Sequence, residues 1–197
     1  MDCMLAMKDM PNNYYDLAIV DPPYGLNKGS IRGGLLNGRK LIQKTDKMEA
    51  WDQAPNQEYF WELMRVSKNQ IIWGGNYFQL MPTRCVIVWD KQQPWENFSQ
   101  VEIAWTSFYK PAAIFRFGIT KYKKEHPTQK PVELYNFLLS RYAKPGDKVI
   151  DTHLGSGSIC LAAHNYKVNL DGFEIDPEYY EIAIRRLNKH QQQQQLF

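Results

Sequence analysis

Two scarcities in this chain exclude whole classes of protein. Only three cysteines occur among its 197 residues, at positions 3, 85 and 160, and none belongs to a C-x-x-C pair. This spacing argues against a disulfide framework and a zinc site, and it favours a reducing setting. No apolar run approaches the roughly 18 residues of a membrane span, and the first ten residues lack a signal-peptide pattern. We therefore expect a cytoplasmic protein without a membrane partner or a bound metal.

The chain also lacks a large excess of charge of one sign. The net charge is +3 at pH 7, which permits a polyanionic partner without indicating one. Core-forming residues are plentiful, because 44% of the chain is hydrophobic and 14% is aromatic. A chain of this length and composition predicts one domain over residues 1–190. The glutamine run after it predicts a disordered tail at 191–197.

Strand and helix patterns alternate along the chain. Apolar runs predict strands at 16–20, 70–73, 85–89, 101–105, 113–117, 148–150 and 170–174. Helical spacing predicts helices at 56–66, 131–143 and 177–189, and a loop running into a helix at 155–164. The alternation predicts an α/β fold with a mostly parallel twisted sheet, helices on both faces and an antiparallel edge within 70–117. Residues 25–50, rich in glycine and basic side chains, predict a long mobile loop that is either functional or disordered.

Asp21-Pro22-Pro23-Tyr24 follows the apolar run 17–20, where a buried strand gives way to a loop. Open α/β sheets bind their ligands at the carboxyl ends of strands. A carboxylate and a proline-fixed carbonyl can accept both N–H bonds of an exocyclic amine, and a tyrosine can stack on the ring that carries it. The alternative is a proline-rich turn that Asp21 opens.

The segment 148–176 reads as strand, glycine-rich turn, helix, strand and acid. Gly155 and Gly157 would let the backbone approach a ligand at a helix N-terminus. Glu174 follows Gly155 by about 20 residues, the spacing from which an acid binds the hydroxyls of a ribose. A third glycine for a pyrophosphate is missing, so a nucleoside ligand without phosphates, such as S-adenosyl-L-methionine, fits. Turn glycines alone are the plainer alternative.

Residues 126–133 lie between these two motifs and read His-Pro-Thr-Gln-Lys-Pro-Val-Glu. One interpretation is a polar loop that caps the following helix. The other is that Lys130 and the start of the helix bind a carboxylate, such as the methionyl tail of the same cofactor.

Four motifs taken together resemble the β-group DNA amino-methyltransferases, and residues 89–98 have a weaker likeness to small phage and prophage members of that group. The four motifs are Asp21–Tyr24, His126–Pro131, Asp151–Gly157 and Phe173–Asp176. The order is the circularly permuted one of that group, with the catalytic motif before the cofactor-binding half. The resemblance implies a Rossmann-like class I methyltransferase fold. The family commonly has D-P-F-x-G-S-G where this chain has Asp-Thr-His-Leu-Gly-Ser-Gly, so the aromatic wall against the cofactor would be His153 or would come from elsewhere in the chain.

The resemblance also implies roles for individual residues. The catalytic residues would be Asp21, Pro22, Pro23 and Tyr24. The residues that bind S-adenosyl-L-methionine would be Asp151, His153, Gly155, Ser156, Gly157, Glu174, Lys130, Thr128 and His126. The expected contacts to nucleic acid are Lys28, Arg32, Arg39, Lys40, Lys121, Lys123 and Lys124, although a solvated charged face explains a basic run equally well. Residues 25–50 would close over the target, and 91–125 would form a small recognition region.

The implied reaction is methyl transfer to the N6 amine of adenine in double-stranded DNA, after base flipping. The resemblance also permits N4-cytosine methylation, since the motif separates the two bases imperfectly. An RNA methyltransferase and a catalytically silent DNA-binding module of the same fold are two further interpretations. The intact Asp21 and Glu174 argue against the silent module. Family resemblance also makes a homodimer reasonable.

Overall fold

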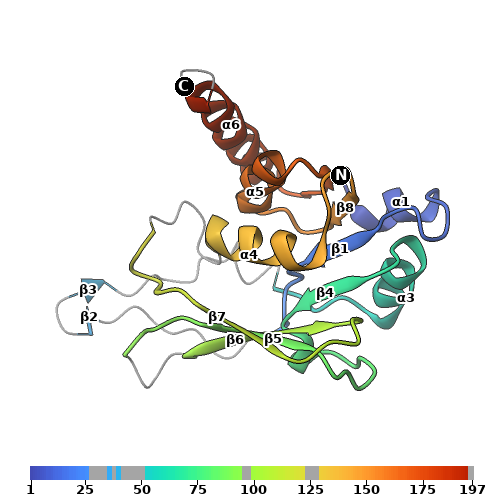
Figure 1. Ribbon diagram of the computed structural model, residues 1–197, viewed down its shortest axis with the longest axis horizontal. Helices are drawn as coiled ribbons and strands as arrows, with labels where there is room; N and C mark the ends of the chain where they lie inside the picture. Colours follow the sequence, from blue (N-terminus) through green and yellow to red (C-terminus); the bar gives the residue numbers. More distant parts are fainter. Residues whose placement is uncertain (27–34, 37–38, 41–51, 95–98, 123–128, 195–197) are drawn as a thin grey trace.

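The computed structural model describes residues 1–26, 35–36, 39–40, 52–94, 99–122 and 129–194. Its helices are α1 (Cys3–Lys8), α3 (Gln57–Val66), the 3-10 turn η1 (Gly75–Tyr77), α4 (Val132–Tyr142), α5 (Ser158–Tyr166) and α6 (Pro177–Gln194). Its strands are β1 (Leu17–Val20), β2 (Leu35–Leu36), β3 (Arg39–Lys40), β4 (Gln70–Trp73), β5 (Val86–Asp90), β6 (Val101–Thr106), β7 (Ala113–Arg116), β8 (Lys148–Asp151) and β9 (Asn169–Gly172). Figure 1 shows α4 lying across the sheet and α6 running away from it to the C-terminus.

Seven strands form one sheet in the order β7-β5-β6-β4-β1-β8-β9. β1 pairs in parallel with β4 and with β8, and β8 pairs in parallel with β9. β6 pairs antiparallel with β4 and β5, which places the expected antiparallel strands in the 70–117 half of the sheet. At the edge, β7 pairs in parallel with β5. The carboxyl ends of β1, β4 and β8 therefore lie side by side.

Alternate residues of the central strands face two separate cores. Leu17 and Ile19 of β1 pack in the cluster that contains the apolar faces of α4 and α5 and Ala183 of α6. Ala18 and Val20 pack with the buried side chains of α1 and α3. The continuous apolar run of β1 is explained by this burial on both faces, as parallel sheets require.

The structure differs from the sequence expectation in several segments. Helix α6 continues to Gln194, into the stretch expected to be a disordered tail, because glutamine is a good helix former and no breaker precedes residue 194. β2 and β3 pair as a short antiparallel ribbon inside the expected 25–50 loop, most of which lies outside the described residues. β9 ends at Gly172, so Glu174 lies in the turn after the strand. Within the described ranges, no helix combines the length and apolarity that crossing a membrane requires.

Candidate active site

Asp21 follows directly on the last residue of β1, at the carboxyl edge of the sheet. Both of its carboxylate oxygens accept hydrogen bonds: the Tyr24 hydroxyl donates to Oδ1 over 2.7 Å, and the Lys130 ammonium donates to Oδ2. The Asp21 side chain is 18% exposed. Burial raises the pKa of Asp21, while the Lys130 charge acts in the opposite direction. The first motif therefore holds a partly desolvated carboxylate that already receives two donors.

Lys130 links Asp21 to an acid that the sequence did not single out. Its Nζ lies 3.1 Å from Oε2 of Glu102 on β6, and only 3% of its side chain is exposed. Burial disfavours the ammonium, but the two carboxylates outweigh that effect and raise the pKa of Lys130. Sequence reasoning assigned Lys130 to the cofactor's carboxylate, whereas the structure places its ammonium between the side chains of Asp21 and Glu102.

Glu102 also contacts a second lysine. Nζ of Lys91 lies 2.6 Å from Oε1 of Glu102. Although burial acts against ionisation, Lys130 and Lys91 together lower the pKa of Glu102 to about 2. In the sequence, Glu102 is visible as an acid in the apolar strand Val-Glu-Ile-Ala-Trp. Its partner lysines are 11 and 28 residues away on other segments, so the sequence alone does not pair them with it.

The Tyr24 ring packs against two aromatic rings of the turn after β4. It stacks on Tyr77, with ring centroids 5.2 Å apart, and meets Phe78 edge to face at 6.1 Å. Gly74 has a left-handed backbone with φ of +69°, and a Cβ built there would lie 2.2 Å from Cε1 of Tyr24. The segment Trp73–Phe78 therefore packs against the Tyr24 ring, and Gly74 is required for space as well as for its backbone angle.

We expect Gly74→Ala to displace the Tyr24 ring and to lower activity by about a hundredfold, because a shift of about 1 Å at a reacting site can cost that much. The matched control is Gly146→Ala. Gly146 also has a positive φ, of +90°, but no atom lies within 4 Å of the Cβ position there. Steady-state methyl transfer by the two variants checks the prediction. Equal losses in both would show that backbone strain, and not contact with Tyr24, is responsible.

The glycine-rich turn connects β8 to α5 and is tied to the turn after β9. The Gly155 N–H donates to Oε2 of Glu174 over 2.7 Å, and the Asp176 N–H donates to Oε1 over 2.9 Å. Gly155 has φ of +54° and open space where a Cβ would stand. Gly157 has a different reason to be glycine, since a Cβ there would lie 2.6 Å from Cβ of Ala183 on α6.

Asp151, His153 and Thr152 line the other end of the turn. The His153 N–H donates to Oδ1 of Asp151 over 3.0 Å, and Oγ1 of Thr152 lies 2.9 Å from Nδ1 of His153 and 2.6 Å from the Tyr59 hydroxyl. Burial lowers the pKa of His153 to about 4, so its ring is neutral at pH 7. Burial raises the pKa of Asp151 to about 7, with smaller contributions from Asp21 and Glu174.

The raised pKa of Asp151 predicts how stability depends on pH. Its folded pKa, about 7, exceeds the ordinary value of 3.8, so its stabilising contribution is complete below about pH 4 and is lost as the pH rises through 7. Asn cannot ionise, so the Asp151→Asn variant does not lose this stability as the pH rises. We expect the free energy of unfolding of the variant, measured by urea titration, to exceed that of wild type increasingly between pH 4 and 7, on the order of a few kcal/mol at pH 8. Parallel pH curves for the two proteins would contradict the assignment.

Of the remaining predicted site residues, some have side chains that the structure describes and others do not. Ser156 is buried, and its carbonyl and hydroxyl both accept from Arg186 of α6, so its described contacts are structural. Lys121 is exposed, with Nζ 5.7 Å from the centroid of the Phe117 ring. The other group lies outside the described residues and comprises His126, Thr128, Lys28, Arg32, Lys123 and Lys124, while only the backbone is described for Arg39 and Lys40.

The residues around the turn fit a nucleoside cofactor. Open space beside Gly155 leaves the backbone accessible to a ligand, and the half-buried Glu174 carboxylate retains lone pairs for hydroxyl donors beyond its two backbone bonds. β1 and β8 are neighbours in the sheet, with Ala18 opposite Ile150. Asp21, at the end of β1, therefore stands beside the strand that leads into this turn.

Comparison with known proteins identifies a protein family for part of this chain. Residues 88–185 match the N6_N4_Mtase family, described as DNA methylase. The type II methyltransferase M.HinfI of Haemophilus influenzae is 24% identical over 243 residues, which cover 95% of this chain and 67% of that protein.

Two solved structures share the fold. The complex of M1.HpyAVI with SAM superposes with a TM-score of 0.64 at 21% identity, covering 95% of this chain and 97% of that one. PvuII DNA methyltransferase, described as cytosine-N4-specific, gives a TM-score of 0.62 at 14% identity, covering 93% and 83%. These likenesses confirm the expected class I methyltransferase fold. The chain belongs to the N6/N4 DNA methyltransferase family, whose methyl donor is S-adenosyl-L-methionine.

Proposed function

We propose that this chain transfers a methyl group to the N6 amine of adenine in duplex DNA, after the base has been flipped into the pocket beside Tyr24. The observation that carries the proposal is the Asp21 carboxylate, partly desolvated at the end of β1 and already accepting two hydrogen bonds. An exocyclic amine inside a duplex is out of reach of such a group, so the base has to leave the stack.

In this proposal, Asp21 accepts a hydrogen bond from the target amine. The amine's lone pair is delocalised into the ring, which makes its nitrogen a poor nucleophile. A hydrogen bond to Asp21, with a second to the Pro22 carbonyl, favours a tetrahedral nitrogen and stabilises the positive charge that develops on it. Tyr24 stacks on the base and fixes the direction of the amine.

The glycine-rich turn is the proposed cofactor site. S-adenosyl-L-methionine, when bound, supplies an electrophilic methyl group on its sulfonium. Glu174 would hold the ribose hydroxyls, while Gly155, Gly157 and Asp151 would form the cradle. The neutral, half-buried ring of His153 would stand in for the aromatic residue usual in the family. Ser156 would contribute only through the backbone of the turn.

N4-cytosine is the second candidate target. The observation in its favour is the structural likeness to PvuII methyltransferase, described as cytosine-N4-specific, which is nearly as close as the likeness to M1.HpyAVI. Both amines would present the same two hydrogens to Asp21, so this carboxylate does not discriminate between them.

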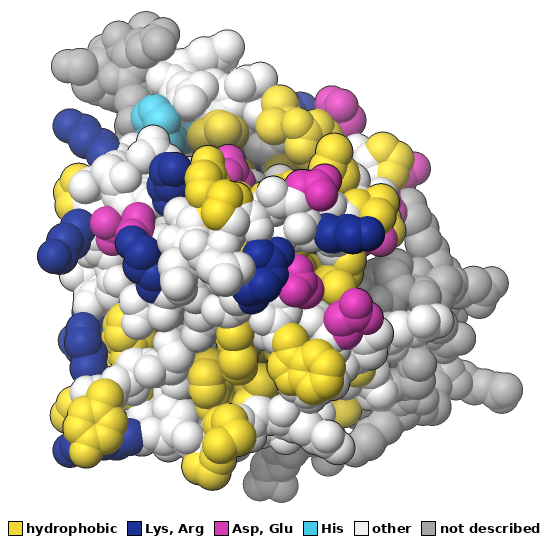
Figure 2. Space-filling model, turned by 90° about the vertical axis from the view of Figure 1, so that its right-hand side faces the viewer, with side chains coloured by type: hydrophobic (Ala, Val, Ile, Leu, Met, Phe, Trp, Pro, Cys, Tyr) yellow, Lys and Arg dark blue, Asp and Glu magenta, His cyan; other side chains and the backbone are white. Residues whose placement is uncertain are grey.

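Contact with the DNA backbone is proposed for the basic residues around the pocket. Lys121 is the member of this set whose side chain the structure describes. The set also includes Lys28, Arg32, Arg39, Lys40, Lys123 and Lys124. On the face seen in Figure 2, basic and acidic side chains are interspersed, so that face presents no single-sign field to a polyanion. A homodimer remains a further prediction.

The test is methyl transfer from labelled S-adenosyl-L-methionine to unmethylated duplex DNA, followed by hydrolysis to nucleosides. We expect the label in N6-methyladenine. Label in N4-methylcytosine would show that cytosine, and not adenine, is the target, and would leave the proposed site unchanged. Label incorporated only when RNA is offered would reject DNA as the substrate.

A further inference from the structure

The buried contact between Lys130 and Asp21 has a consequence for the target amine. The Lys130 ammonium donates to Oδ2 of Asp21, and the Tyr24 hydroxyl donates to Oδ1. A target amine that donates to Asp21 therefore uses a remaining lone pair on an oxygen that already accepts one hydrogen bond. The ammonium is the stronger competitor, because charge-assisted hydrogen bonds are roughly twice as strong as neutral ones. The amine therefore binds Asp21 more strongly when the Lys130 ammonium shifts to another acceptor.

Glu102 lies within reach of the same ammonium. Its Oε2 is 3.1 Å from Nζ of Lys130, so no large movement is needed to shift the ammonium from Asp21 toward Glu102. Lys130 is 3% exposed and cannot turn to bulk water without breaking its packing. Nζ also lies 5.1 Å from the centroid of the buried Trp73 ring, which confines the ammonium on that side. The described surroundings thus offer two alternative carboxylates on one short path.

The sheet fixes Glu102 in this place. Trp73, the last residue of β4, pairs with Ala104 of β6, and β6 runs antiparallel to β4. Glu102 precedes Ala104 by two residues, so it lies on the same face of the sheet and just beyond the carboxyl end of β4. Nζ of Lys91 lies 2.6 Å from its Oε1 and holds the carboxylate from the side away from Lys130.

We propose that Glu102 is a positioning residue, which takes over the Lys130 ammonium when the target amine binds Asp21. The proposal rests on the proposed function and extends it, since Glu102 acts through Lys130 and does not touch the base. Because the carboxylate is already fixed by Lys91 and by the sheet, the exchange costs little reorganisation. Without Glu102, Lys130 would remain on Asp21 and compete with the amine.

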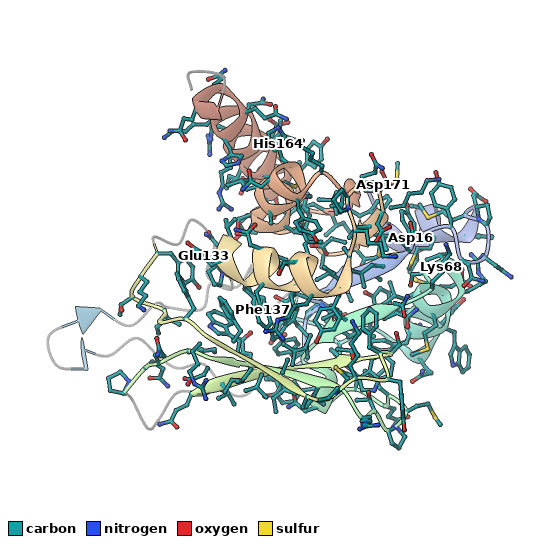
Figure 3. All side chains as sticks on the ribbon, viewed as in Figure 1. Asp16, Lys68, Glu133, Phe137, His164 and Asp171 are labelled. Carbon is teal, nitrogen blue, oxygen red and sulfur yellow. The ribbon has the colours of Figure 1, made fainter. Side chains whose placement is uncertain are left out.

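Glu102→Gln tests this in the full chain. We expect kcat for methyl transfer to fall between about tenfold and a hundredfold, the scale of a misplaced reacting group, while affinity for S-adenosyl-L-methionine stays at the wild-type value. Glu102→Asp keeps the charge at a shorter reach and is expected to give an intermediate kcat. Glu133→Gln is the matched control, because Glu133 is exposed in the first turn of α4 (Figure 3) and has the same substitution.

The pH dependence supplies a readout that a merely structural role would not move. The charge of Glu102 raises the pKa of Asp21, so its removal lowers that pKa. The acidic limb of the kcat profile is therefore expected to move to lower pH in Glu102→Gln and to stay in place in Glu133→Gln. The same direction is expected for the Asp21 carboxyl in a ¹³C NMR titration of the free protein. The described groups that interact with Asp21 are Tyr24, Lys130, Glu102, Asp151, Tyr59 and Tyr135.

Each outcome decides a different question. An inactive wild-type protein would reject the proposed function. An active wild type with a Glu102→Gln profile like that of Glu133→Gln would overturn the role of Glu102 alone. A loss of cofactor affinity equal to the loss of kcat would also overturn it. If Glu102→Gln does not fold, Glu102→Asp carries the test, with a smaller shift of the acidic limb in the same direction expected and an unchanged limb contradicting the proposal.

Discussion

Asp21→Ala is expected to lower kcat for methyl transfer by about a thousandfold or more, while leaving affinity for S-adenosyl-L-methionine close to wild type. The magnitude is that of removing a group that stabilises charge only in the transition state. The variant also leaves the Tyr24 hydroxyl and the Lys130 ammonium without their shared acceptor. Single-turnover transfer to duplex DNA, paired with calorimetry for the cofactor, separates loss of chemistry from loss of binding.

Asp16→Ala is the matched control for this variant. Asp16 precedes the first residue of the same strand and accepts from Lys68 over 2.7 Å, at the opposite end of β1 from Asp21; Figure 3 labels both Asp16 and Lys68. Its removal also breaks a carboxylate–lysine pair next to β1, but at the opposite end. We expect near-normal transfer from it. Transfer at the wild-type rate by Asp21→Ala would reject the catalytic assignment.

Glu174→Ala is expected to weaken binding of S-adenosyl-L-methionine by about tenfold to a hundredfold. This corresponds to the loss of one or two hydrogen bonds to a charged acceptor. The substitution also removes the carboxylate that accepts from the N–H groups of Gly155 and Asp176, so the glycine-rich turn loses its link to the turn after β9. Both effects act on binding of the cofactor, and calorimetry of the free protein measures them directly.

The control for this second variant is Glu178→Ala, which removes an exposed carboxylate from the first turn of α6. It changes the net charge by the same amount close to the same turn. Unchanged affinity in Glu174→Ala would refute the ribose assignment. Equal weakening in both variants would point to the local charge, in place of a specific hydrogen bond to the ribose.

The parts of the site that lie within short motifs could be predicted from the sequence. Asp21 follows an apolar run, and the carboxyl end of a buried strand is where an open sheet places its ligands. The glycine-rich turn and Glu174 follow the same logic, through the spacing of strand, turn and acid. Their placement depends on local order along the chain, which a single sequence records.

The ion pairs across the site could not be predicted in that way. Lys91, Glu102 and Lys130 meet only because β5 pairs with β6 and the segment before α4 returns over them. The position of Lys130 at a helix start predicted a carboxylate partner in the cofactor, whereas the fold brings two distant acids, Asp21 and Glu102, to the same ammonium. The burial that makes this network consequential is likewise a property of tertiary structure.

The edge of the sheet and the end of α6 show the same limit. Residues 70–117 were expected to be antiparallel from their short spacing, yet β7 joins β5 in parallel, with Ile87 opposite Ala113. Spacing predicts that strands exist, whereas the direction of an edge strand depends on the path of the connection. Helix α6 was expected to end at residue 189, because the polar glutamine run was interpreted from its composition as disordered. The helix continues to Gln194, in keeping with the helix propensity of glutamine.

The most direct test of the proposed site is a crystal structure of the protein with a duplex carrying its target base and with S-adenosyl-L-homocysteine in place of the methyl donor. We predict the exocyclic nitrogen of a flipped base within hydrogen-bonding distance, about 2.7–3.2 Å, of an Asp21 carboxylate oxygen. A flipped base whose amine lies elsewhere, with Asp21 still held by Lys130 and Tyr24 alone, would contradict the catalytic role of Asp21.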